Sequence, residues 1–109
     1  MIGIDVVDLA RLRKALARTP RLKDRLFTAA ELEYCLSRPD PIPHLAGTLA
    51  AKEAVIKTYR LGILAGWARR IEIVREADGA PYAKVGDHRC WVSISHDGPV
   101  AVAVALADR

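Results

Sequence analysis

The spacing of apolar residues changes once along this chain of 109 residues, near Trp67. Before that point apolar side chains recur every three or four positions, which is the spacing of helices that bury one face. After it they alternate with other residues, which is typical of strands in an antiparallel sheet. A chain with helices in one half and strands in the other is predicted to be α+β. Because no repeat and no linker is visible, we expect residues 1–109 to form one domain.

The first segment predicts a strand followed by a helix. Residues 2–7 are rich in β-branched side chains and suit a short strand that ends at the carboxylate of Asp5. Asp8 has the position of a helix N-cap, because leucines at helical spacing follow it. Pro20 then closes this helix.

Two further helices are expected before the change of spacing. Thr28 and Glu31 have the spacing of a capping box, which places a helix over about 28–37. A loop with three prolines follows. A longer helix is then predicted over about 44–60, with Gly62 as its terminating glycine.

The second half predicts four antiparallel strands. Their sequences are RIEIVRE, PYAKV, CWVSIS and VAVAVAL, separated by turns at the Asp78–Gly79 pair, at a GDH triplet and at 96–99. The last strand has small residues at every second position, which favours close packing against a helix or another subunit. The predicted fold is therefore an N-terminal strand and helices followed by an antiparallel sheet packed on a long helix.

Composition narrows the function classes. Hydrophobic residues make up 51% of the chain, but no apolar run approaches the roughly eighteen residues of a membrane span. Asp5 interrupts the apolar N-terminal segment where a secretory signal needs a continuous apolar core, so we expect a cytoplasmic protein. Cys35 and Cys90 are interpreted as reduced, packed thiols. The net charge of +4 predicts an anionic partner, and nucleic acid, a phosphorylated cofactor and an acidic protein all satisfy it.

Two carboxylates and two lysines are the first candidates for chemistry. Glu53 and Lys57 are four positions apart, the spacing of an ordinary surface pair worth about 0.3–0.5 kcal/mol, and Lys52 precedes them. Alanines around this pair favour a cleft instead, because a small-residue surface lets a ligand approach. Asp5 is either a strand-end cap or the partner of a cation. Asp5 and Glu53 together could supply hard oxygen ligands to a Mg²⁺ that is shared with a substrate phosphate.

Other residues carry weaker signals. His96, in SISH before an Asp-Gly turn, is either a turn residue or a site residue, and no Cys or His spacing resembles a transition-metal site. No glycine-rich phosphate loop is present. The positive charge leaves open a basic, non-catalytic RNA-binding module. The strands, however, lack a cluster of aromatic residues alternating with Lys or Arg, which a base-stacking surface requires.

Five segments, in this order, resemble the small type of 4′-phosphopantetheinyl transferase, the holo-[acyl-carrier-protein] synthases. They are GID at 3–5, LAG plus AAKEAVIK within 45–57, IEI at 71–73, DGAPY at 78–82 and SISH at 93–96. The resemblance covers nearly the whole chain. It implies the 4′-phosphopantetheinyl transferase fold, and transfer of 4′-phosphopantetheine from coenzyme A to a serine of an apo acyl or peptidyl carrier protein, with release of 3′,5′-ADP.

The resemblance also implies roles for individual residues. Asp5 and Glu53 would hold Mg²⁺. Glu53 and Lys57 would be catalytic, with the serine proton passing to Glu53 or to a metal-bound water. The residues implied in coenzyme A binding are Lys52, Lys57, Gly62, Pro81 and His96, the last at the 3′-phosphorylated end. Thr48 stands where the family often has arginine, so another basic residue is expected to substitute.

The implied partners are an acidic acyl carrier protein and further copies of the chain in a homotrimer with active sites at the subunit seams. No nucleic acid or membrane partner is expected. The predicted carrier-docking residues, on and after the first helix, are Arg11, Lys14, Arg18, Arg21 and Arg25, and the alternative is an ordinary solvated face. Whether the carrier serves fatty acid, polyketide or peptide synthesis is not implied. A degenerate transferase acting as a scaffold subunit is a further alternative, against which the intact Asp5, Glu53 and Lys57 argue.

Overall fold

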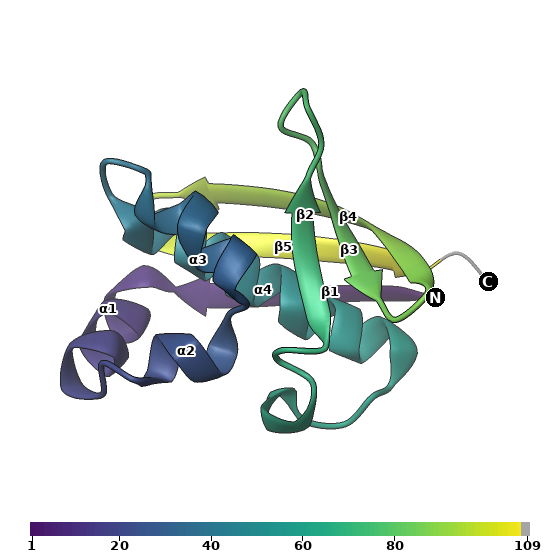
Figure 1. Cartoon of the computed structure of the whole chain (residues 1–109), viewed down its shortest axis with the longest axis horizontal. Helices are drawn as coiled ribbons and strands as arrows, with labels where there is room; N and C mark the ends of the chain where they lie inside the picture. Colours follow the sequence, from purple (N-terminus) through teal and green to yellow (C-terminus); the bar gives the residue numbers. More distant parts are fainter. Residues whose placement is uncertain (108–109) are drawn as a thin grey trace.

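The computed structural model of this chain describes residues 1–107. In chain order its elements are β1 (Ile2–Asp8), α1 (Leu9–Arg18), α2 (Leu22–Leu26), α3 (Ala29–Leu36), α4 (Pro41–Tyr59), the 3₁₀ turn η1 (Leu64–Gly66), β2 (Ile71–Arg75), β3 (Pro81–Val85), β4 (His88–Asp97) and β5 (Val100–Ala107). The strands form one antiparallel sheet in the order β1-β5-β4-β3-β2. Figure 1 shows α1, α2 and α3 gathered at one end of the molecule and the β2–β3 hairpin toward the other. The α+β class and the antiparallel sheet on a long helix are confirmed.

Small residues let α4 lie directly on the sheet. The alanines of β5 that face α4, at 101, 103 and 105, are fully buried, as are those of α4 at 46, 50, 51 and 54. At Gly3 of β1 an added Cβ would lie only 2.1 Å from the carbonyl oxygen of Ala54, so a side chain has no room there. The small residues of VAVAVAL therefore pack against a helix. The prediction had allowed either a helix or another subunit as their partner.

The opposite side of the sheet carries large apolar side chains, and several of them remain about half exposed or more among residues 1–107. We call it the outer sheet face; its residues are Ile2, Ile4, Val6, Trp91, Val102, Val104 and Leu106. Register places Ile4 beside Val104, and Leu106 between Ile2 and Trp91. Ile2 is 71% exposed and Trp91 69%. Contiguous apolar surface of this kind usually marks an interaction site.

The helix caps follow the predicted chemistry. The Asp8 carboxylate accepts a hydrogen bond from the backbone N–H of Ala10 at the start of α1. Both halves of the Thr28–Glu31 capping box are formed at the start of α3. Cys35 and Cys90 are both buried and free, as expected.

Four local expectations are wrong. The five-residue helix α2 was not predicted, because it is too short to show a periodic pattern. The long helix begins at Pro41 rather than near residue 44, since Asp40 caps it and a proline in the first turn lacks only an N–H that has no partner there. It ends at Arg60, which adopts the left-handed conformation (φ 57°) expected of Gly62. Strand β1 continues to Asp8, so Asp5 is not at a strand end.

A further difference from the prediction concerns His96. It lies within β4, paired with Ala101, rather than in the turn. Within residues 1–107, no helix is both long enough and apolar enough to cross a membrane.

Candidate active site

Asp5 and Lys57 meet where β1 passes under the last turn of α4. Alternate residues of β1 face α4, and Asp5 is one of them. The Lys57 ammonium Nζ lies 2.9 Å from Asp5 Oδ1 and 3.0 Å from the carbonyl oxygen of Ile4. Lys57 is more than half exposed, whereas the Asp5 side chain is largely covered. The Lys57 ammonium is thus paired with the Asp5 carboxylate, and the lysine side chain remains accessible to solvent.

Glu53 lies one helical turn before Lys57 on the same side of α4. Partial burial raises the pKa of Glu53, the negative charge of Asp5 raises it further, and Lys57 acts in the opposite direction. Two carboxylates therefore repel each other electrostatically at one place on the surface. Such a pair is favourable only when a cation or a proton accompanies it.

A cleft of about 330 Å³ opens beside these groups. The residues lining it come from β1, α1, α4 and η1: Asp5, Val6, Val7, Asp8, Arg11, Leu12, Leu49, Glu53 and Leu64. Arg11 is the one cation among them. Because Arg11 belongs to the predicted docking helix, the basic surface of α1 runs directly into this cleft.

Lys52 does not reach this cleft, contrary to its predicted contact with coenzyme A. Its side chain is fully buried, and its Nζ lies 2.6 Å from Oε1 of Glu31. Glu31 also accepts hydrogen bonds from the backbone N–H groups of Ile73 and Thr28. Burial raises the pKa of Glu31 and lowers the pKa of Lys52, and each shift is opposed by the partner's charge. Lys52 therefore joins α4 to α3 and β2, and its role in the structure is internal.

His96 lies on the other flank of α4. Its ring is 5.8 Å, centroid to centroid, from that of His44 in the first turn of α4. His44 and Glu53 are nine positions apart, which at about 100° per residue places them on opposite sides of the helix. The structure therefore brings Asp5, Glu53 and Lys57 together and leaves His96 apart from them within a single chain.

Neither of the two remaining predicted coenzyme residues lines the cleft beside the carboxylates. Gly62 follows α4 in an exposed segment with φ 100°. Pro81 lines a second cleft, of about 530 Å³, together with Tyr82, Arg89 and Trp91. Because Tyr82 pairs with Trp91 on the outer sheet face, this cleft opens on that face. The side-by-side aromatic pair was not visible in the sequence, since its members come from different strands.

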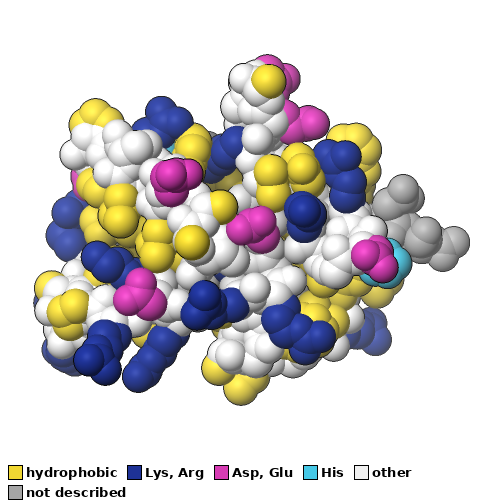
Figure 2. All heavy atoms as spheres, in the orientation of Figure 1, with side chains coloured by type: hydrophobic (Ala, Val, Ile, Leu, Met, Phe, Trp, Pro, Cys, Tyr) yellow, Lys and Arg dark blue, Asp and Glu magenta, His cyan; other side chains and the backbone are white. Residues whose placement is uncertain are grey.

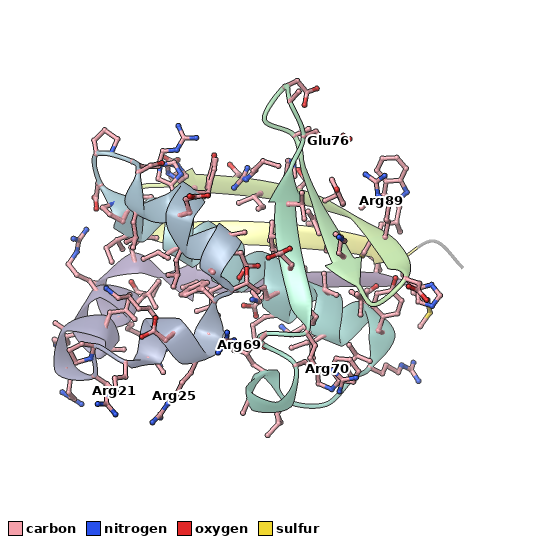
Figure 3. All side chains as sticks on the ribbon, in the orientation of Figure 1. Arg21, Arg25, Arg69, Arg70, Glu76 and Arg89 are labelled. Carbon is pink, nitrogen blue, oxygen red and sulfur yellow. The ribbon has the colours of Figure 1, made fainter. Side chains whose placement is uncertain are left out.

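The predicted docking residues form one exposed basic surface. Figure 2 shows Lys and Arg side chains gathered along the edge formed by α1 and α2. Within residues 1–107, none of Arg11, Lys14, Arg18, Arg21 and Arg25 forms a salt bridge. Arg69 and Arg70, in the segment between η1 and β2, project to the same side as Arg21 and Arg25 (Figure 3). Surface charge without acidic partners fits an anionic macromolecule.

Sequence reasoning missed three residues that matter at the site. Glu31 was interpreted only as a capping residue, because its position in the sequence gives no sign of its ion pair with Lys52. Tyr34 and His44 were not assigned a role, yet the His44 ring lies between those of Tyr34 and His96 and contacts each edge to face. Only the packing of α3 on α4 could have identified them.

Comparison with known proteins identifies the class first. Residues 1–105 match the family described as the 4′-phosphopantetheinyl transferase superfamily. The match covers almost all of the chain, and the chain belongs to this family.

Individual relatives are more specific. The chain is 43% identical over 112 residues to holo-[acyl-carrier-protein] synthase of Chlorobaculum tepidum, covering 96% of this chain and 95% of the relative. It is 40% identical over 116 residues to the synthase of Chlamydia pneumoniae, with 97% and 94% covered. Its fold superimposes on the crystal structure of the Helicobacter pylori synthase in complex with coenzyme A, with a TM-score of 0.86, 28% identity and coverage of 99% and 100%. The predicted family and fold are confirmed.

Proposed function

We propose that this chain transfers 4′-phosphopantetheine from coenzyme A to a serine of an apo acyl carrier protein and releases 3′,5′-ADP. The observation that carries the proposal is that Asp5 and Glu53 line one open cleft and that Lys57 is paired with Asp5 beside it. These three residues come from the two segments, GID and AAKEAVIK, that resemble the family's signatures. The relatives named holo-[acyl-carrier-protein] synthase, and the solved relative with bound coenzyme A, support the same substrates.

In this reaction the serine oxygen attacks the β-phosphorus of coenzyme A. A new P–O bond forms to the serine, and the bond from that phosphorus to the bridging oxygen breaks, so that 3′,5′-ADP leaves with the bridging oxygen. Catalysis of phosphoryl transfer rests mainly on positioning and on stabilising charge. The exposed ammonium of Lys57 would neutralise charge on the departing phosphate.

The serine proton has two candidate acceptors, Glu53 and a water in the cleft. The raised pKa of Glu53 makes this carboxylate a stronger base than an ordinary glutamate.

We also propose that Asp5 and Glu53 hold Mg²⁺. Carboxylate oxygens are the ligands that Mg²⁺ prefers, and the ion usually keeps several waters and takes further oxygens from a substrate phosphate. The mutual repulsion of the two carboxylates is a cost that a bound cation would remove. When bound, the ion would offset the charge of the pyrophosphate.

The active form is proposed to be a homotrimer with coenzyme A at each subunit seam, as the family resemblance implies. Two observations support a site shared between copies. His96 and the carboxylates lie on opposite flanks of α4, so one chain alone does not surround a single ligand with all of them. The uncovered apolar side chains of the outer sheet face offer an interface.

The carrier protein is proposed to dock on α1 and α2, beside the cleft. Arg11 lines the cleft itself, so a carrier bound along Lys14, Arg18 and Arg21 would present its serine near Asp5. The reaction is proposed to take place in the cytoplasm, which suits two cysteines that are buried and unpaired.

The experiment that tests the function is an intact-mass measurement of an apo carrier protein after incubation with this protein, coenzyme A and Mg²⁺. We expect the carrier to gain the mass of one phosphopantetheine, and to gain nothing when its acceptor serine is replaced by alanine. An unchanged carrier mass with several apo carriers would reject the transferase, and would favour a scaffold subunit or a non-catalytic binding module.

A further inference from the structure

The buried ion pair between Glu31 and Lys52 takes no part in the reaction proposed above, although Lys52 directly precedes Glu53. Neither side chain of the pair is more than 1% exposed, and their charged atoms lie 2.6 Å apart. The Glu31 carboxylate also accepts hydrogen bonds from the backbone N–H groups of Thr28 and Ile73, at 2.8 and 2.7 Å. One carboxylate thus joins the start of α3, the middle of α4 and the edge strand β2.

Stability alone does not account for this pair. Removing two charges from water usually costs more than their attraction in the interior returns, and a well-packed apolar pair of the same size is often at least as stable. What the ion pair adds is direction, because a carboxylate with three short hydrogen bonds fixes where its donors lie. The pair therefore restricts the arrangement of α3, α4 and β2 more than an apolar contact would.

The turn of α4 that carries Glu53 is anchored by Lys52. Residues 50–54 read AAKEA, and their three alanines are fully buried. Because alanine has no side chain beyond Cβ to interlock with neighbours, these contacts set the distance of α4 from the sheet more firmly than its rotation. Within residues 50–54, Lys52 is the one long side chain that is buried. A rotation of α4 by about 20° would move a side-chain end that lies about 5 Å from the helix axis by about 2 Å.

We propose that Glu31 and Lys52 are positioning residues, whose ion pair fixes the rotation of α4 and so holds the Glu53 carboxylate beside Asp5 at the cleft. The inference rests on the proposed function, in which both carboxylates bind Mg²⁺. Lys52 reaches toward α3 and β2, and the next position is turned by about 100°, which directs Glu53 to the cleft. A displacement of about 1 Å can slow a catalysed step by about a hundredfold, so the pair affects the reaction without touching a substrate.

The test replaces the pair by uncharged side chains of nearly the same shape, Glu31→Gln/Lys52→Met. This double variant leaves no buried charge unpaired and should stay folded, whereas Lys52→Met alone leaves the Glu31 charge without its partner and should melt at a much lower temperature. The control Glu33→Gln/Arg60→Met makes the same two changes at exposed residues of α3 and of the end of α4.

Calorimetric titration with Mg²⁺ is the first readout. Relative to the control, the double variant should bind Mg²⁺ at least about tenfold more weakly, and its kcat at a fixed low Mg²⁺ concentration should fall by a similar factor. The KM for coenzyme A should stay within about threefold, because the pair does not line the cleft. A folded double variant that matches the control in Mg²⁺ affinity and in kcat would overturn the proposal.

The variant Glu31→Asp keeps both charges and shortens one arm of the pair by a methylene. It should also bind Mg²⁺ several-fold more weakly than wild type. Thermal melting establishes that each variant is folded. If the double variant does not fold, wild-type Mg²⁺ affinity in folded Glu31→Asp would overturn the proposal in its place.

Crystal structures of wild type and of a folded variant give a readout that needs neither metal nor turnover. We expect the Glu53 carboxylate of the variant to be displaced relative to Asp5 by about 1 Å or more. Unchanged positions would overturn the positioning role. If wild type neither binds Mg²⁺ nor transfers phosphopantetheine, the proposed function fails, and these two structures still decide whether the ion pair holds Glu53 in place.

Discussion

At the scale of single residues, the charge of Glu53 affects stability as well as the metal binding that we propose for it. Its folded-state pKa is raised above the ordinary value of roughly 4.3 for glutamate. The folded form therefore favours the protonated side chain. The associated stability is fully present below the ordinary pKa and is lost as the pH rises through the raised value. Ionisation of Glu53 at neutral pH therefore lowers the stability of the folded protein.

Glu53→Gln should consequently abolish most transfer yet melt at a higher temperature than wild type at neutral pH without Mg²⁺. The gain should vanish near pH 4, where Glu53 of the wild type is largely protonated. Mg²⁺ should raise the melting temperature of wild type and of the control Glu33→Gln, an exposed residue of α3, but not that of Glu53→Gln. Near wild-type turnover by Glu53→Gln at limiting Mg²⁺ would mean that the metal site is assigned wrongly.

At the scale of elements, the close approach of β1 to α4 fixes the site. Gly3→Ala would place its Cβ 2.1 Å from the Ala54 carbonyl oxygen and 3.0 Å from the backbone nitrogen of Thr58. Backbone atoms cannot rotate away, so the two elements must separate. We expect a loss of at least the 1–3 kcal/mol, roughly, that overpacking usually costs. The Asp5–Lys57 contact spans the same crossing, so transfer activity should fall as well.

Urea unfolding measures this loss. The matched control is Gly66→Ala, where an added Cβ meets no atom within 4 Å. If Gly3→Ala unfolds at the same urea concentration as Gly66→Ala, the crossing of β1 and α4 is looser than the structure has it.

The docking surface of α1 and α2 is also tested at this scale. Arg11 is a poor probe, because it lines the cleft and its loss would disturb the carboxylates directly. Arg18 lies two turns further along α1 and is exposed. Arg18→Glu should lower kcat/KM for the carrier several-fold at low salt and leave the affinity for coenzyme A unchanged, because surface charges mainly set the encounter rate. Arg60→Glu makes the same change of charge at the far end of α4 and should have little effect.

A raised salt concentration should narrow the difference between wild type and Arg18→Glu, as the Debye length shrinks from about 10 Å at 0.1 M toward about 3 Å at 1 M. Equal carrier kinetics for both proteins at low salt would place the docking surface elsewhere.

The sequence predicted elements better than it predicted which flank of an element a residue would occupy. Asp5, Glu53 and Lys57 were found because each stands out locally: a carboxylate among apolar strand residues, and a charged pair among alanines. Lys52 was misplaced because neighbouring helix positions point about 100° apart, and only the position of α3 decides which of them is buried. The separation of His96 from the carboxylates depends on how α4 crosses the sheet, which no local pattern encodes.

At the scale of the whole molecule, the outer sheet face is the surface that we propose for association between copies of the chain. A domain of this size buries a modest fraction of its surface, and this face leaves apolar side chains on β1, β4 and β5 in water. Association between copies of the chain would bury them.

If the proposed trimer forms through this face, Ile4→Glu should convert it into monomers in light scattering at micromolar concentration. Ile4 is 56% exposed and lies beside Val104 on the outer sheet face, so an ionised side chain there would have to be desolvated at the interface. Only the backbone carbonyl of Ile4 contacts Lys57, so the substitution leaves that contact in place.

The control Ile63→Glu alters a side chain that is more exposed, at 75%, but lies outside the sheet, and it should remain trimeric. The monomeric variant should keep its fold and lose transfer from coenzyme A, because the flank that carries His96 is no longer supplied by a neighbour. A wild-type protein that is monomeric and fully active would remove both the trimer and the shared site.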